Sequence, residues 1–165
     1  MGNYYYLVAQ LPYLKFNETP PISTKKFLAE SRKWLSEKEL TELQRTQLEG
    51  TNESADVGAI LKKYYHFENR LKKELVAWRK ARQQGTEHKI DIFDPGILKD
   101  GTPLDSELKL LRLRWKFLDE LAAGFEFEFP VLLIYYIKLQ VLERLQTFDH
   151  ERGLEKFKHY TEVSL

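Results

Sequence analysis

The chain has 165 residues, which is enough for one domain with a buried core and without covalent cross-links. Its 26 Lys and Arg against 25 Asp and Glu leave a net charge of +1, so no whole-molecule field favours nucleic acid or an acidic membrane as a partner. The absence of cysteine excludes disulfides, thiolate nucleophiles and cysteine-based metal sites, and it fits a reducing compartment.

Neither a signal peptide nor a membrane span is expected. The first residues lack a basic segment followed by a long apolar run. The longest apolar run, residues 129–137, is about half of the roughly 20 residues that cross a bilayer. We therefore expect a cytoplasmic protein that is peripheral at the inner membrane only through its partners.

The N-terminal part of the sequence predicts short elements. Residues 4–14 are aromatic and apolar, and their periodicity is ambiguous between a short helix and a strand. Ser23 can cap a helix whose apolar side chains recur at intervals of three, four and seven. Ser36 and Glu39 have the spacing of a capping box, which predicts the start of a further helix.

Longer helices follow. Residues 55–84 carry one apolar stripe at intervals of three and four, and Gly85 stands where a glycine commonly ends a helix. Residues 103–123 are periodic again, and Pro130 suits the first turn of the next helix. A last amphipathic stretch covers residues 149–163.

These patterns predict an all-α protein. We expect residues 1–165 to form a single domain of about six or seven helices, with long antiparallel helices around one core. Residues 86–102, which contain the turn sequences Asp-Pro-Gly and Asp-Gly, are predicted to form an internal loop.

The sequence shows no catalytic or metal-binding cluster. Its four histidines do not recur at the three- or four-residue spacing of a helical metal site. The loop acids lack the alternation of a calcium loop, and we interpret them as turn-formers: Asp91, Asp94, Asp100 and Asp105. Neither a glycine-rich phosphate loop nor a nucleophile elbow is present. We therefore predict that the chain is not an enzyme on its own and has no catalytic residue, cofactor or metal.

Residues 125–129 alternate Phe and Glu. Two carboxylates on one side could suggest acid–base chemistry, but no His or Arg is identifiable beside them. We interpret the segment as an amphipathic linker, with its Phe side chains inside and Glu126 and Glu128 outside.

Basic residues gather on two of the predicted long helices. If these helices pack antiparallel, Arg79, Arg82, Arg112 and Arg114 approach one another and form one positive face. Such a face is a candidate binding site for the acidic patch of a partner protein, since Arg can hold carboxylates by paired hydrogen bonds. The alternatives are a nucleic-acid partner and the ordinary enrichment of basic residues near helix C-termini.

The aromatic content gives a second candidate for partner binding. The chain has 9 Tyr, 10 Phe and 3 Trp. Tyr4, Tyr5 and Tyr6 cannot all point inward, so we expect part of this aromatic surface to be exposed. Tyr and Trp are enriched at protein interfaces.

Several segments carry a resemblance to a known family: YYYLVAQLP at residues 4–12, PPIS at 20–23 with FL at 27–28, YYHFE at 64–68, and IYYIKLQVLER at 134–144 with FD at 148–149 and Gly153. In these segments the chain resembles an uncharacterised bacterial family whose genes lie among those for V-type (rotary) ATPase subunits. The opening tyrosines and the last segment are also similar to the all-helical central-stalk subunit called C in prokaryotic V-type ATPases and d in eukaryotic ones. That longer subunit joins the rotating shaft to the membrane ring.

The resemblance implies a non-catalytic component or accessory of a V-type ATPase, including a shortened counterpart of the central-stalk adapter. Its partners would be other protein subunits of the complex. The runner-up prediction is a basic helical nucleic-acid-binding protein, and a third is an enzyme whose site the sequence order conceals. Steep salt dependence of binding would distinguish a nucleic-acid partner from an apolar docking surface.

Overall fold

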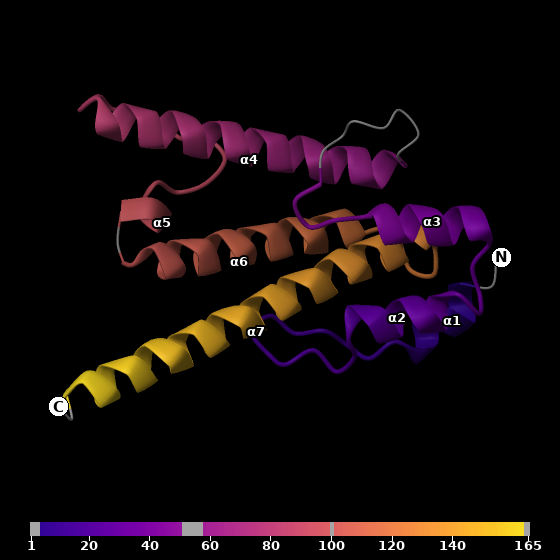
Figure 1. The fold of residues 1–165 in the computed structure, drawn as a ribbon. Helices are drawn as coiled ribbons and strands as arrows, with labels where there is room; N and C mark the ends of the chain where they lie inside the picture. Colours follow the sequence, from indigo (N-terminus) through magenta and orange to yellow (C-terminus); the bar gives the residue numbers. More distant parts are fainter. Residues whose placement is uncertain (1–3, 51–57, 100, 164–165) are drawn as a thin grey trace.

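The computed structural model describes the backbone of residues 4–50, 58–99 and 101–163, and the side chains of these ranges as far as Phe148. Within these ranges the chain forms seven α-helices and no strand, which confirms the predicted all-α class (Figure 1). The helices are α1 (Tyr4–Gln10), α2 (Thr24–Ser31), α3 (Glu37–Arg45), α4 (Ala59–Gln83), α5 (Gly96–Lys99), α6 (Pro103–Ala122) and α7 (Phe129–Val163). None of the helices in the described part of the chain has both the length and the apolar composition needed to cross a bilayer.

The first half of α7 is the centre of the fold. It packs against α1, α2, α3 and α6. Its buried side chains are Leu132, Leu133, Ile134, Ile137, Leu139, Val141, Leu142, Leu145 and Phe148. These residues point in all directions around the helix, so they do not form a single stripe, and residues 129–137 are apolar without interruption.

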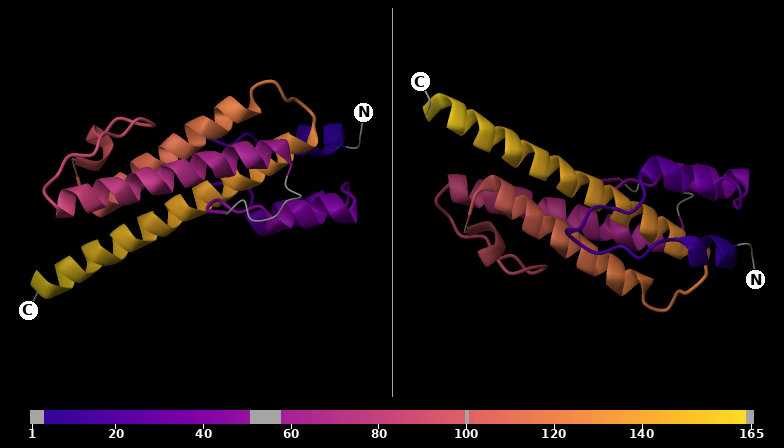
Figure 2. Two further views of the ribbon diagram at one scale, coloured as in Figure 1. Left: turned by 90° about the horizontal axis from the view of Figure 1, so that it is seen from above. Right: turned by 90° about the horizontal axis from the view of Figure 1, so that it is seen from below.

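The second half of α7 extends away from the other helices (Figures 1 and 2). The sequence predicts a separate stretch at residues 149–163, but the structure continues one helix from Phe129 to Val163. Gly153 is the weakest helix former in this segment, and a single glycine in a helix costs only about 1 kcal/mol relative to Ala.

The helices α4 and α6 run antiparallel, as Figures 1 and 2 show. Beneath the C-terminal half of α4 lies a second hydrophobic cluster, which consists of Leu71, Leu75, Ile90, Phe93 and Leu110. Ile90 and Phe93 belong to the predicted loop 86–102, which also contains α5. The loop is therefore packed against the helices by its own apolar side chains. The core consists of two clusters where the sequence predicted one.

The helix ends follow the local sequence signals. The Ser23 hydroxyl accepts a hydrogen bond from the backbone N–H of Lys26 at 3.1 Å. Ser36 and Glu39 form both hydrogen bonds of a capping box at the start of α3, as predicted. Gly85 has φ +70° beside the end of α4, a conformation that favours glycine.

Candidate functional site

The register between α4 and α6 decides where the predicted basic residues lie. Phe67 of α4 stacks on Phe117 of α6 with ring centroids 4.1 Å apart. Glu68 of α4 pairs with Arg114 of α6. Positions 67–68 of α4 are therefore level with positions 114–117 of α6.

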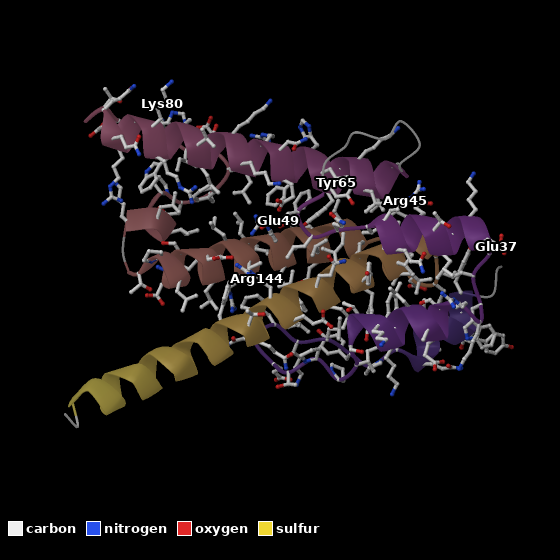
Figure 3. The ribbon with its side chains drawn as sticks, in the orientation of Figure 1. Glu37, Arg45, Glu49, Tyr65, Lys80 and Arg144 are labelled. Atoms are coloured by element: carbon white, nitrogen blue, oxygen red, sulfur yellow. The ribbon has the colours of Figure 1, made fainter. Side chains whose placement is uncertain are left out.

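This register separates the arginines that were predicted to form one face. Arg79 and Arg82 lie 11 and 14 residues beyond Glu68 along α4, whereas Arg112 lies only two residues before Arg114 on the antiparallel helix. At 1.5 Å per residue, Arg112 is roughly 13–18 Å from Arg79 and Arg82 along the helix axis. Figure 3 shows Lys80, their neighbour on α4, pointing away from α6. The prediction of one shared positive face is therefore wrong.

Arg114 is excluded from the surface altogether. It is only 5% exposed and donates to Glu68, which is fully buried, with Nε 2.5 Å from Oε1 and Nη2 3.3 Å from Oε2. Burial alone would lower the pKa of Arg114, but the hydrogen bond and the negative charge of Glu68 outweigh burial and raise it. Arg114 is therefore a structural residue of the α4–α6 interface. It is not on the exposed partner-binding surface where the sequence predicted it.

Two hollows in the surface each contain one of the remaining arginines, Arg82 and Arg112, whereas Arg79 is exposed and lines neither of them. Arg82 lies over the ring of Trp78, 5.2 Å from its centroid, beside a hollow of about 730 Å³ near the end of α4. Arg112 lies over the ring of Phe16, also at 5.2 Å, in a separate groove along α6. The two arginines therefore belong to different surfaces.

Three of the exposed aromatic side chains, Tyr5, Tyr6 and Phe127, come together in contrast. Tyr6 stacks on Trp34 with centroids 5.9 Å apart, and its neighbour Tyr5 contacts it edge-on at 5.6 Å. Tyr5 also packs on Phe127 at 4.6 Å. We call these four residues the aromatic strip. Tyr5, Tyr6 and Phe127 are 50%, 61% and 42% exposed.

The aromatic strip is assembled from three parts of the chain. Tyr5 and Tyr6 belong to α1, Trp34 follows α2, and Phe127 lies in the connection between α6 and α7. Figure 1 shows these three parts at the end of the molecule where the N-terminus lies. The packing of α1 and α2 on α7 therefore creates a surface that no single segment contains.

Tyr4 fixes the direction in which the strip faces. Its hydroxyl donates to Oε1 of Glu39, and its ring packs on Phe129 at 6.0 Å. Leu7, one helical turn later, is buried. Because positions 4 and 7 share the inner side of α1, Tyr5 and Tyr6 face solvent. This confirms the expectation that the three tyrosines cannot all point inward.

The Tyr4–Glu39 hydrogen bond affects the titration of both groups. The bond to the Glu39 carboxylate, together with burial, raises the pKa of Tyr4 to about 12. Burial alone would raise the pKa of Glu39, but hydrogen bonds from Tyr4 and from Ser36 lower it below its usual value. The carboxylate is therefore held in its charged form while it anchors α1 to α3.

The linker prediction is wrong for one of its three Phe residues. Phe125 and Phe129 are half-buried and Glu126 and Glu128 are exposed, but Phe127 is exposed as well. The segment is a bend that follows Gly124 at φ +103°, so its side chains do not alternate between two faces as in a strand. Packing against Tyr5 explains the direction of Phe127.

Comparison with models of known families, with curated proteins and with solved structures finds no match to this chain. The resemblance to proteins of the V-type ATPase therefore stays a prediction. In the part of the chain that the structure describes, no three His, Asp or Glu side chains are close enough to share a metal ion. The aromatic strip has the composition of a protein-contact surface, because Tyr and Trp combine large apolar area with a polar group.

Proposed function

We propose that this chain is a non-catalytic component or accessory of a V-type ATPase, including as a shortened counterpart of the central-stalk adapter, and that it binds another subunit through the aromatic strip. The observation that carries the binding surface is the exposed Tyr5–Tyr6–Phe127 contact, which joins separate segments. The V-type ATPase as the partner is supported by the sequence resemblance.

The aromatic strip suits a partner protein for energetic reasons. Aromatic side chains bury large areas, and contacting rings contribute about 0.5–1.5 kcal/mol beyond that burial. Because the rings already support one another, little side-chain freedom remains to be lost on binding. Such pre-ordered aromatic residues are typical of the few positions that dominate an interface.

Affinity capture tests the proposal. The tagged full-length chain is incubated with detergent-solubilised membranes of cells that contain it naturally, and captured proteins are identified by mass spectrometry. We expect V-type ATPase subunits with the parent chain and their loss with Tyr5→Ala/Tyr6→Ala. The matched control is Tyr13→Ala, because Tyr13 is 84% exposed but outside the aromatic strip.

The outcomes separate the two parts of the proposal. Capture of the ATPase that is equal for the parent and for Tyr5→Ala/Tyr6→Ala would refute the strip as the surface. Strip-dependent capture of other proteins without the ATPase would refute the V-type ATPase assignment. Binding of duplex DNA by the parent at physiological salt would favour the runner-up, since phosphate contacts are steeply salt-dependent.

A further inference from the structure

A groove with a volume of about 570 Å³ runs along the outer side of α6. Its floor is apolar and combines one residue before α2, one residue of α5 and two residues of α6: Phe16, Ile97, Leu113 and Trp115. The groove is separate from the aromatic strip, since the two share no residue.

The rim of the groove carries three basic residues. Lys109, Arg112 and Lys116 stand at positions i, i+3 and i+7 of α6, which places them on one side of the helix. Among the described residues, none of the three has a carboxylate within ion-pair distance. The single acid of the groove, Asp119, is paired with Lys138 of α7.

Ring contacts fix the floor in place. Phe16 meets Trp115 edge-on, with centroids 5.6 Å apart. The Arg112 guanidinium lies 5.2 Å from the centroid of Phe16, and the Lys138 ammonium lies 4.8 Å from that of Trp115. The groove is therefore bounded by ordered aromatic and basic groups.

We propose that this groove docks an acidic, amphipathic helix of a partner protein. The three basic residues span about 10 Å, two turns of a helix, so a second helix with acids at the same spacing would face all of them. Apolar side chains beside those acids would occupy the floor, as in other helix-in-groove complexes. Arg112 adds directional specificity because its planar guanidinium can bind a carboxylate through two hydrogen bonds.

The apolar floor favours a protein partner over nucleic acid. A phosphate backbone would satisfy the three basic groups but would leave the floor of Phe16, Ile97, Leu113 and Trp115 uncovered. An amphipathic helix satisfies both parts of the groove. The inference stands independently of the aromatic strip and of the V-type ATPase assignment.

Fluorescence anisotropy with a designed probe tests the inference. The probe is a fluorescein-labelled peptide of about 18 residues, five helical turns, with Glu on one stripe and Leu on the adjacent one. Its control has the same composition in a scrambled order. We expect the full-length parent to bind the amphipathic probe and to bind the scrambled peptide about tenfold or more weakly.

Two charge-reversal variants assign the site. Arg112→Glu/Lys116→Glu alters the rim, while Arg70→Glu/Lys73→Glu makes the same change of net charge at exposed positions of α4 outside the groove. We expect about tenfold weaker binding for the first and near-parental binding for the second, because only the first turns attraction into repulsion at the rim. All four side chains are exposed, so circular dichroism melting should show both variants folded.

Three results would overturn the inference. These are equal loss of binding in the two variants, equal binding of the two peptides, and displacement of the probe by duplex DNA at physiological salt. Tyr5→Ala/Tyr6→Ala should bind the probe normally, so failure at the groove and failure at the strip can be told apart.

Discussion

Arg114 and Glu68 form a buried ion pair between α6 and α4, with Nε 2.5 Å from Oε1. A charge that is removed from water is stable only while its partner remains. The pair also fixes the register that separates Arg112 from Arg79 and Arg82. It is therefore a structural determinant of which surfaces this fold presents.

Removing one partner should be costly. We expect Arg114→Met to lower the free energy of unfolding by about 3–5 kcal/mol, because it leaves the Glu68 carboxylate buried and unpaired. Glu68→Leu combined with Arg114→Met should restore most of that loss, since both charges are then absent. Urea denaturation of the three proteins measures this, and a double variant as unstable as the single one would contradict it.

Charge reversal distinguishes Arg112 from Arg114 directly. Arg112→Glu should leave the free energy of unfolding within about 0.5 kcal/mol of the parent, because the side chain is exposed. Arg114→Glu places a second carboxylate against Glu68 and should prevent stable folding. Thermal melting followed by circular dichroism compares the two. Equal melting temperatures would show that Arg114 is not buried.

The Tyr4–Glu39 bond predicts a pH dependence of stability. The pKa of Glu39 is lowered, so its contribution is present above its usual pKa of 4.5 and is lost as the pH falls through the folded value. The pKa of Tyr4 is raised from 10.0 to about 12, so its contribution is complete below pH 10 and is lost between pH 10 and 12.

Tyr4→Phe isolates this hydrogen bond. We expect the free energy of unfolding to fall by about 1 kcal/mol at neutral pH. The alkaline decline between pH 10 and 12 should become smaller in the variant. The loss of stability at acid pH should change only in part, because Ser36 also donates hydrogen bonds to the Glu39 carboxylate. Denaturant titrations across the pH range provide the measurement, and an unchanged alkaline limb would contradict the assignment.

Two tryptophans test the placement of the core. Trp115 is 8% exposed and belongs to the main cluster, whereas Trp78 is half-buried at the edge of the second one. Trp115→Ala should cost about 3–5 kcal/mol, and Trp78→Ala should cost clearly less because part of its ring already contacts solvent. Trp78 also belongs to the apolar stripe predicted for residues 55–84, so the sequence alone predicts a cost of about 3–5 kcal/mol for Trp78→Ala if that stripe is buried. Chemical denaturation of both variants decides between these expectations.

Local signals in the sequence predicted much of the fold. The caps at Ser23 and Ser36 and the glycine after α4 act within a few residues, so their spacing is readable from the sequence. The exposure of part of the Tyr4–Tyr6 group was also predictable, since consecutive helical residues cannot share one face.

The contacts between distant segments were not predictable in the same way. Glu68 and Arg114 are 46 residues apart, and nothing local distinguishes Arg114 from the exposed Arg112. The aromatic strip was missed as a unit because Trp34 and Phe127 reach Tyr5 and Tyr6 only after α1 and α2 pack on α7. The sequence contained one signal of the strip, which is Phe127 between two glutamates. An aromatic residue at such a place is unusual in a bend that faces solvent.

The most direct test of the central proposal is the affinity of the purified chain for a purified V-type ATPase, measured by biolayer interferometry. We predict saturable binding that Tyr5→Ala/Tyr6→Ala weakens by about a hundredfold, since two central aromatic contacts are each worth roughly 1–2 kcal/mol or more. Tyr13→Ala should bind as the parent does. Absence of binding, or equal affinities of all three proteins, would contradict the proposal.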